Sequence, residues 1–523
     1  MVELSWKMAD RKTMRIPLDR SADRSGRLSL ARQIRLHLER LIRQGLLGPG
    51  VKLPATRELA RELGVNRTTV ALAYDALVAE GWARAHVGQG TFVAERAPAA
   101  DPAVRPATSR FEWTGFLSKG AQAVGADARR RQGYSRLPRS SPGLISFVGG
   151  MPDATLFPTD AFRRVLNRVI RSEGRELLQY YPARGYPPLR EYLAGYLLRL
   201  GVEVRPDEIL IVNGSQQGFD LVARTLLDPG DFVAIEHPSY PRAMQVFRGF
   251  GAQLLPIPLV GGGVGVDHLE RVLERQSPKL LYCQPSAHNP TGETMPAPAR
   301  QRLMEVVARY RLPVVEDGFH GTLFYGERPP APLKALDPTG QVIYVGTFSK
   351  VLFPGLRLGW IVAVPELIER LEIAKEVSDI HTSPILQAAV FHFCRERLLD
   401  RHQARVLREC TRRRTVLLAA LGRRMPPGTR WTEPDGGFSL LVTLPEGLDA
   451  ADLLPRAVER GVGFTPGQVF HADGSGERTL RLSFSAVPVG QVEEGVRRLA
   501  LVIGEALRHP GRTRAVSPAV PLV

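Results

Sequence analysis

From about residue 144 onward the chain alternates short apolar segments with helical stretches, and this alternation leaves few possible folds. Strands that alternate with helices favour an α/β domain with a mostly parallel sheet. Ligands of such sheets bind at the carboxyl ends of the strands, so we expect site residues where each apolar run ends. The strongest runs are EILIVNG (208–214), FVAIEHP (232–238), KLLYCQPS (279–286), LPVVED (312–317) and VIYVGTF (342–348).

At 523 residues the chain is too long for a single hydrophobic core, so we expect two or three domains. It has no run of about 18 apolar residues, which predicts no membrane-spanning helix. The N-terminus lacks the pattern of a secretory signal. The three cysteines are widely spaced, so we expect neither a disulfide framework nor a metal site. A cytoplasmic protein fits these features.

The positive charge is concentrated in the first part of the chain. Residues 1–141 carry 25 lysines and arginines against 13 acidic residues, whereas the remaining residues carry 45 against 40. This asymmetry indicates a polyanionic partner for the basic part. A solvated basic tail in an arginine-rich chain is the alternative, because charge alone gives only a sequence-independent attraction to phosphate.

The basic part contains the pattern of a helix-turn-helix followed by a wing. A first helix is expected after Ser29, a second over Thr56–Leu63, and a third that begins at the cap Asn66. The helix–GVN–helix spacing predicts a helix-turn-helix, since a glycine lies in the turn. The segment WARAHVGQGTFV (82–93) predicts two short strands around a glycine-rich tip.

The first turn of the third helix is the expected DNA-reading segment. Residues at the start of a recognition helix reach base edges, while its free N–H groups face phosphate. A small helical domain with ordinary polar surface residues is the alternative, but the full order of helices, turn and wing favours DNA. The short polar or basic residues of this turn are Asn66, Arg67, Thr68 and Thr69.

The segment LPATRELARELGVNRTTVALAYDALVAEGW, followed by GQGTFV, resembles the winged-helix domain of the GntR superfamily of bacterial transcription regulators. The resemblance covers roughly residues 28–93 and implies binding to a double-stranded DNA operator. The residues that it places against DNA are Arg57, Arg67, Thr68, Thr69 and Gly88.

Three domains follow from these patterns. We expect a winged-helix domain over 16–95, a linker over 96–141 and a cofactor-binding domain over 142–510. The linker is rich in alanine, proline, arginine and serine, which predicts partial disorder.

Polar residues follow several of the predicted strands. Ser215 and Gln216 begin a helix after the first strand, and a helix N-terminus binds anions. Asp317 ends another strand, where it either caps a turn or pairs with a protonated ring nitrogen. The turn HNPTG offers the amide of Asn289, and HPSYP offers Tyr240, which can stack on a flat ring.

The segment GTFSKVLFPGLRLGW (346–360) places Lys350 at the end of a predicted strand. Thr347 and Ser349 supply hydroxyls beside it, and Arg357 supplies a bidentate phosphate donor. A lysine amine in such a setting forms Schiff bases with aldehydes. The required ligand has a flat ring, a ring nitrogen, a phosphate and an aldehyde, and pyridoxal 5′-phosphate has all four.

Residues 144 to about 505 resemble a fold-type I aminotransferase of the kynurenine/2-aminoadipate branch, with a large α/β domain and a smaller α+β domain. Seven motifs occur in the family's order: QYYPARGYPPLR, NGSQQG, HPSYP, HNPTG, ED, TFSKVLFPGLRLGW and RLSFS. The resemblance implies that Lys350 carries the cofactor, Asp317 pairs with the pyridine nitrogen and Tyr240 stacks on the ring. It implies that Asn289 bonds the 3′-oxygen. The implied phosphate ligands are Ser215, Gln216, Thr347, Ser349 and Arg357.

The same resemblance implies roles at the edges of the site. Tyr180 would reach the phosphate of a second subunit, since family members are dimers. Arg481 would hold an α-carboxylate, and Arg242 a second acidic group. The chain departs from the family in one respect: Phe319 and His320 occupy the two positions after the aspartate at which a tyrosine is usual. This departure puts full transamination, although not cofactor binding, in question.

A GntR-type winged helix joined to an aminotransferase-like domain is the layout of the MocR/GabR family of bacterial regulators, which the chain resembles along most of its length. The resemblance implies a homodimeric transcription regulator that senses an amine or amino acid through pyridoxal phosphate. An active aminotransferase with an appended winged helix is the alternative. A cofactor-free dimerisation scaffold is a third interpretation, which the intact cofactor positions disfavour.

Overall fold

The computed structural model describes residues 16–18, 29–86, 88–95, 113–135, 143–151, 153–319, 323–326 and 330–509, with the backbone alone at 127 and 129–135. The chain divides into two compact units, Met1–Trp113 and Thr114–Val523. The expectations placed on His320, on residues 96–112 and on residues 136–142 lie outside the described residues.

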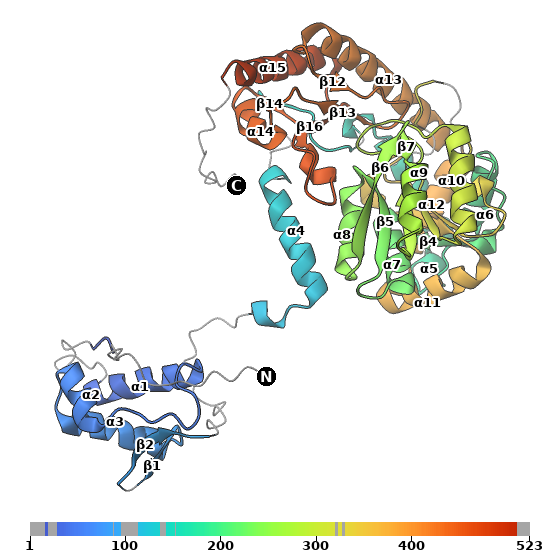
Figure 1. Cartoon of the computed structure of the whole chain (residues 1–523). Helices are drawn as coiled ribbons and strands as arrows, with labels where there is room; N and C mark the ends of the chain where they lie inside the picture. Colours follow the sequence, from blue (N-terminus) through green and yellow to red (C-terminus); the bar gives the residue numbers. More distant parts are fainter. Residues whose placement is uncertain are drawn as a thin grey trace. The chain divides into compact units, whose positions relative to one another are not determined.

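The first unit is the predicted helix-turn-helix with its wing (Figure 1). Apolar side chains of its three helices meet in one core that includes Ile34, Leu59 and Val70, all fully buried. Gly64 ends the second helix at φ 62°, a left-handed conformation that glycine adopts without strain. Ser29 precedes the first helix but makes no side-chain cap. The elements are α1 (Leu30–Arg43), α2 (Thr56–Leu63), α3 (Arg67–Ala79) and the antiparallel strands β1 (Ala83–His86) and β2 (Gly90–Val93).

The second unit is built on an eight-stranded sheet in the order β4-β11-β10-β9-β8-β5-β6-β7. The five predicted strands and β6 run parallel to one another, while β11 and the short β7 run antiparallel to their neighbours. All four residues of β4, β8 and β9 are buried, as expected of strands covered on both faces. The strands are β4 (Ile209–Val212), β5 (Phe232–His237), β6 (Gln253–Val260), β7 (Gly263–Val264), β8 (Leu280–Cys283), β9 (Val314–Asp317), β10 (Val342–Thr347) and β11 (Gly359–Val362).

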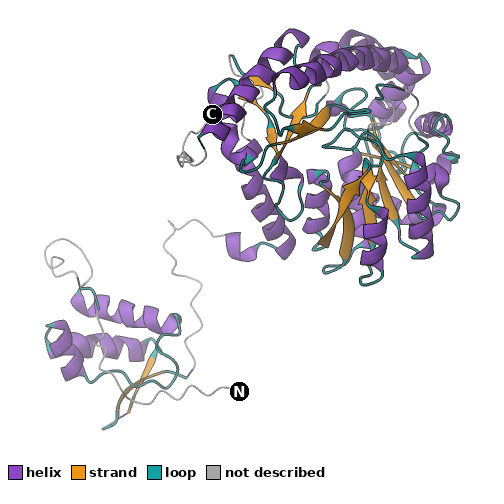
Figure 2. Ribbon diagram, turned by 45° about the horizontal axis from the view of Figure 1, so that its top comes forward, coloured by secondary structure: helices purple, strands orange, loops and turns teal. Residues whose placement is uncertain are grey.

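Helices cover both faces of this sheet (Figure 2). One face packs against α7, α8 and α11, and the opposite face packs against α6, α9, α10 and α12. Several of these helices begin with proline, whose fixed φ suits the first helical turn. The helices are α5 (Thr159–Leu177), α6 (Pro187–Leu198), α7 (Ser215–Leu226), α8 (Pro241–Gly249), α9 (Val266–Leu273), α10 (Ala297–Arg309), α11 (Pro365–Asp379) and α12 (Pro384–Arg395).

A smaller α+β part of the second unit contains a four-stranded sheet in the order β12-β13-β16-β15. A separate pair joins β3 (Ile145–Ser146) in parallel with β14 (Val462–Gly463), so residues before the large sheet belong to this part. Among the described helices of the whole chain, none is long and apolar enough to cross a membrane. The remaining elements are β12 (Arg430–Trp431), β13 (Ser439–Thr443), β15 (Thr465–Pro466), β16 (Thr479–Ser483), α13 (Leu398–Arg424), α14 (Ala450–Glu459) and α15 (Val489–Arg508).

A helix that the composition does not predict, α4 (Lys119–Ser135), lies within the segment expected to be a partly disordered linker. It contacts α8, and the two helices approach each other at Gly120 and Gly249 (Figure 1). A Cβ atom on Gly120 would lie 2.1 Å from the carbonyl oxygen of Gly249. Val124 of α4 also packs beside Gly249. Because the closest approach is between two glycines, the hydrophobic pattern of the sequence does not reveal the contact.

Candidate functional site

Asp317 ends β9 with its carboxylate in the interior, 1% exposed. Its Oδ2 accepts hydrogen bonds from the Tyr282 hydroxyl and from Gln284 Nε2, both at 2.7 Å. Its Oδ1 is buried without a hydrogen-bond partner. Burial raises the pKa of Asp317 to about 6, although these two donors and the backbone N–H of Phe319 lower it. A buried carboxylate oxygen without a donor fits a cationic ligand group.

A chain of hydrogen bonds leads from Asp317 to Arg481. The side-chain oxygen of Gln284 accepts the backbone N–H of Asn289 at 3.1 Å, and Asn289 Oδ1 accepts from Arg481 Nη1 at 3.0 Å. Arg481 also donates to the carbonyl of Gly149, and its guanidinium lies 4.8 Å from the centre of the Phe470 ring. Burial lowers the pKa of Arg481 to about 10. A buried guanidinium held by neutral oxygens is suited to a carboxylate ligand.

Lys350 follows β10 and is partly buried. Its Nζ donates to the carbonyl of Gly150 at 2.8 Å and lies 4.0 Å from the Met151 sulfur. The adjacent glycines 149 and 150 therefore bind both Arg481 and Lys350, which brings the two cationic groups to one stretch of backbone.

Hydroxyls, a guanidinium and a helix N-terminus meet beside Lys350. Thr347 and Ser349 lie with their hydroxyl oxygens 3.0 Å apart, and Arg357 Nη1 lies 3.5 Å from the Ser349 hydroxyl. Arg357 Nη2 donates to the carbonyl of Asn213 at 3.2 Å, next to the start of α7. This arrangement is an anion site of the phosphate-binding kind. Ser215 and Gln216, the two other predicted phosphate ligands, are the first residues of α7.

Gly214 permits the close approach of Arg357 to this helix start. It has φ 79°, and a Cβ atom there would lie 2.7 Å from Arg357 Nη2. Arg357 is itself in the left-handed region, at φ 51°, where a non-glycine residue is strained. Such strain at a cluster of anion-binding groups is typical of a functional site.

Tyr240 immediately precedes α8 and is partly buried. Burial, followed by the Asp317 carboxylate, raises the pKa of Tyr240 to about 12, against the opposing effects of Arg242, Arg357 and Arg481. These electrostatic neighbours place Tyr240 among the other candidate residues. Arg242 is exposed on the first turn of α8 and donates to Gln245 at 3.4 Å, so it lies at the edge of the site.

Tyr180 lies on the surface and contributes nothing to the cluster in its own chain. It is 81% exposed, and its ring packs edge-on against His381 with 6.0 Å between ring centres. An exposed tyrosine fits a contact with another molecule better than a role in the site of its own chain.

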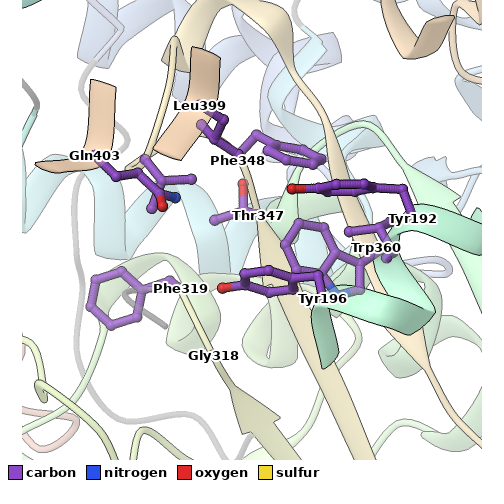
Figure 3. Close-up of a pocket in the computed structure, with 11 residues that line it drawn as sticks. Tyr192, Tyr196, Gly318, Phe319, Thr347, Phe348, Trp360, Leu399 and Gln403 are labelled. Carbon is purple, nitrogen blue, oxygen red and sulfur yellow. The ribbon is translucent and has the colours of Figure 1, made fainter. Parts of the chain in front are cut away.

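A small cavity lies beside the predicted site, with room for about one water molecule. Figure 3 shows Phe319 and Thr347 on its wall together with the aromatic rings of Tyr192 and Tyr196. Phe319, one of the two positions where the resemblance implies a tyrosine, is 7% exposed, and its side chain has no hydroxyl to donate.

Several residues that support the site were not predicted from the sequence. Tyr282 and Gln284 belong to a predicted strand and its end, and the rule that site residues follow strands points to Gln284. The glycine pair at 149–150 carries no pattern of its own. Four residues behind the anion site were also missed: Asn213, Gln217, Lys375 and Asp379.

In the first unit, the predicted DNA-reading residues gather at the start of α3. Asn66 Oδ1 accepts from the backbone N–H of Thr68 at 3.2 Å and from its hydroxyl at 2.9 Å, so Asn66 caps the helix. Arg67 and Thr68 are exposed, and Thr69 is partly exposed. Of the remaining predicted contacts, Arg57 is exposed on α2 and Gly88 lies at the wing tip with φ 78°.

Comparison with known proteins defines the class of the chain. Residues 151–499 match the family of class I and II aminotransferases, and residues 30–93 match the gntR family of bacterial regulatory proteins. The chain therefore belongs to the class I and II aminotransferase family and carries a gntR-family DNA-binding domain at its N-terminus.

Relatives with the same two-part layout extend along nearly the whole chain. The Probable rhizopine catabolism regulatory protein MocR of Rhizobium meliloti is 33% identical over 485 residues, which is 92% of this chain and 94% of MocR. The HTH-type transcriptional regulator TauR of Rhodobacter capsulatus is 32% identical over 91% of this chain and 96% of its own length. MocR-type regulators are thus homologues of this protein.

Other relatives match the second unit alone. The 2-aminoadipate transaminase of Thermus thermophilus is 41% identical over 401 residues, which is 76% of this chain and 98% of the enzyme. The crystal structure of LysN, an alpha-aminoadipate aminotransferase from Thermus thermophilus complexed with N-(5′-phosphopyridoxyl)-L-leucine, superposes with a TM-score of 0.70 at 39% identity. The match covers 76% of this chain and 100% of LysN.

Proposed function

We propose that this protein is a transcription regulator that binds pyridoxal 5′-phosphate in its aminotransferase domain and senses an amine or amino acid there. The observation that carries the proposal is Asp317 Oδ1, which is buried without a partner in a chain that also has a gntR-family DNA-binding domain. A buried acceptor without a donor destabilises the fold. In a protein that binds no cofactor, nothing would compensate this cost.

The described residues fit the cofactor. We propose that Lys350 supplies the amine for covalent attachment and that Asp317 holds a proton on the ring nitrogen. Asn289 and Tyr240 are the proposed contacts of the ring. The anion cluster formed by Thr347, Ser349 and Arg357 with the start of α7 is suited to the phosphate. When bound, pyridoxal phosphate acts as an electron sink for an attached amine.

Arg481 is the proposed holder of an effector carboxylate. Its partners in the structure, Asn289 and the carbonyl of Gly149, are neutral, so an anionic ligand offers a stronger bond. Arg242, exposed at the edge of the site, is the proposed contact for a second acidic group. These assignments favour an amino acid over a simple amine as the effector.

An active aminotransferase with an appended DNA-binding domain is the second candidate. The 41% identity with a transaminase favours it, while the absence of a hydroxyl at Phe319 opposes it. Both candidates predict cofactor binding, but only the enzyme predicts steady turnover. An amino acid supplied with 2-oxoglutarate therefore distinguishes them: continuous formation of glutamate supports the enzyme, and a single change of the visible absorbance without turnover supports the sensor.

We further propose that the protein is a homodimer. Exposed large apolar side chains occur on the segment around Tyr180 and at the end of α11. These two segments are neighbours, because the ring of Tyr180 contacts the ring of His381, which follows α11. Single exposed apolar residues are ordinary, but a group of them marks an interaction surface. Light scattering tests the subunit number. The members of this group are Leu178, Tyr180, Ile373, Val377 and Ile380.

A series of contacts within the second unit connects Arg481 with α4. Phe470 packs under Arg481, and the carbonyl of nearby Ala472 accepts a hydrogen bond from Arg248 on α8. The C-terminal end of α8 carries Gly249, against which α4 packs through Gly120. We propose that α8 passes a change at the site to α4 and so to the chain segment that leads to the DNA-binding domain.

The proposal is tested with the purified full-length protein. The expected result is a visible absorbance band from the lysine-bound cofactor, a shift of that band by one or more amino acids, and a change of operator affinity with the same compound. Operator affinity that is identical with and without a compound that shifts the band contradicts the sensor function.

A further inference from the structure

Behind the anion cluster lies a partly buried group of polar side chains centred on Asp379, the last residue of α11. Its two oxygens accept from Lys375 Nζ at 2.7 and 2.9 Å. Gln217 Nε2 donates to Oδ2 at 2.7 Å, and the side-chain amide of Asn213 donates to the same oxygen. Asp379 thus joins α11 to the turn that precedes α7 and to the first turn of that helix.

The same group fixes the backbone of that turn. Gln217 Oε1 accepts the backbone N–H of Asn213 at 2.7 Å, so the side chain of Gln217 bonds to Asp379 at one end and to the turn at the other. The carbonyl of Asn213 accepts from Arg357 Nη2 at 3.2 Å. One carboxylate therefore lies two hydrogen bonds from the arginine proposed to hold the phosphate.

The burial of Lys375 needs a reason, because its ammonium group loses hydration there, whereas the Asp379 carboxylate stays partly exposed. Lys375 is 0% exposed, and burial lowers its pKa, while the hydrogen bonds to Asp379 raise it. Apolar residues of the same volume often stabilise a fold as well or better. What the ionic pair provides, and apolar residues do not, is a carboxylate with acceptor capacity left for Asn213 and Gln217.

We propose that Asp379 is a positioning residue for the cofactor phosphate: it holds the turn at 213–214 so that the first N–H groups of α7 and Arg357 face one anion. This inference rests on the proposed function, because it presupposes that pyridoxal phosphate is the ligand. Asp379 does not touch the phosphate; it acts through Asn213 and Gln217.

The test compares two ligands that differ only in the phosphate, pyridoxal 5′-phosphate and pyridoxal, in the cofactor-free full-length protein. In the variant Asp379→Ala the dissociation constant of pyridoxal phosphate is expected to rise roughly tenfold or more, the loss of about one strong hydrogen-bond contribution. The dissociation constant of pyridoxal is expected to stay near its wild-type value, since the lysine and the ring contacts are unchanged. Glu376→Ala, an exposed carboxylate on the same helix, is the matched control.

Each outcome decides between a positioning role, a structural role and failure of the proposed function. An equal loss of affinity for both ligands shows that Asp379 merely supports the fold, and unchanged affinity for pyridoxal phosphate overturns the inference directly. If the wild-type protein binds neither ligand, the proposed function fails and the inference falls with it. Asp379→Asn, which keeps the shape and one acceptor oxygen, is the second variant if the alanine variant does not fold. In this variant the ratio of the dissociation constant of pyridoxal phosphate to that of pyridoxal is expected to rise less than in Asp379→Ala.

Discussion

Tyr282 donates its hydroxyl hydrogen to Asp317 Oδ2 across 2.7 Å, and both residues are buried at the centre of the large sheet. Gln284 serves the same oxygen, which leaves Oδ1 without a donor. The two side-chain donors therefore hold the carboxylate through one oxygen. Burial makes the charge of Asp317 unfavourable in the cofactor-free protein, and a cationic ring nitrogen beside Oδ1 would make it favourable.

The variant Asp317→Asn is expected to stabilise the cofactor-free protein near pH 7.5 while it weakens binding of pyridoxal phosphate. Burial raises the pKa of Asp317 in the folded state from its ordinary value of 3.8 to about 6, so ionisation of Asp317 opposes folding. That shift corresponds to about 3 kcal/mol at a pH above 6. Thermal or denaturant unfolding of the cofactor-free protein measures the gain.

The raised pKa of Asp317 also predicts how the stability difference between the wild type and Asp317→Asn changes with pH. Because the folded-state pKa is the higher one, the cost is absent below about pH 4, grows between pH 4 and 6, and is complete above pH 6. The stability advantage of Asp317→Asn is therefore expected to shrink as the pH falls from 7 to 4. An advantage of constant size, or a loss of stability at neutral pH, contradicts an ionisable and uncompensated Asp317.

The variant Lys350→Ala is expected to abolish the visible absorbance band of the bound cofactor without abolishing cofactor binding or DNA binding. Lys350 supplies the covalent bond, whereas Thr347, Ser349 and Arg357 form a separate anion cluster. Absorbance spectra together with equilibrium dialysis separate the two effects. Lys279→Ala, at an exposed lysine of the same unit, is the control. Survival of the band in Lys350→Ala refutes the assignment of this lysine.

How far the sequence predicts this molecule depends on the range of the contacts involved. The positions of Asp317 and Lys350 were predictable because one ends an apolar run and the other follows one closely, and the five parallel strands follow from local patterns. The bond from Lys350 to Gly150 spans 200 positions and joins two parts of the fold, so no local pattern records it. Gln284 is an intermediate case, since the sequence predicts its position after a strand but not its hydrogen bond to Asp317. Helix α4 was missed because its contact through Gly120 uses no apolar stripe.

The variant Arg67→Ala is expected to weaken specific operator binding by about 1–3 kcal/mol if the side chain reads a base edge, and by less if it meets phosphate alone. Arg67 is exposed on the first turn of α3, where the cap Asn66 fixes the backbone. Titrations on operator and scrambled DNA at one salt concentration separate the two cases. Arg40→Ala, an exposed arginine on α1, controls for loss of charge alone. An Arg67→Ala protein that binds both DNAs like the wild type shows that α3 is not the reading helix.

The variant Arg481→Ala is expected to weaken the binding of amino acids far more than that of the corresponding decarboxylated amines. The guanidinium is 8% exposed and supplies paired donors, so its removal should cost a carboxylate ligand at least about 2 kcal/mol. The measurement compares the amino acid that shifts the visible band most with its decarboxylated amine. The band of the unliganded protein should remain. Equal losses for both compounds would assign Arg481 to the architecture of the site and not to carboxylate recognition.

The variant Gly120→Ala is expected to uncouple effector binding from DNA binding. Alanine favours a helix by about 1 kcal/mol over glycine, so α4 itself should persist. Its Cβ atom would nevertheless lie 2.1 Å from the carbonyl oxygen of Gly249, which forces α4 away from α8. The absorbance band and its shift by an effector should then be unchanged, while the effect of that compound on operator affinity falls towards none.

Thermodynamic linkage provides a second measurement of the same coupling. If an effector changes the affinity for operator DNA by some factor, operator DNA must change the affinity for the effector by the same factor. A wild-type coupling of about 1–3 kcal/mol is the usual range. Both measurements should lose the coupling together in Gly120→Ala. Gly115→Ala, in the same segment but with open space around the new Cβ atom, should keep it. Full coupling in Gly120→Ala would mean that the signal does not pass through the contact between α4 and α8, and that a different part of the second unit must move.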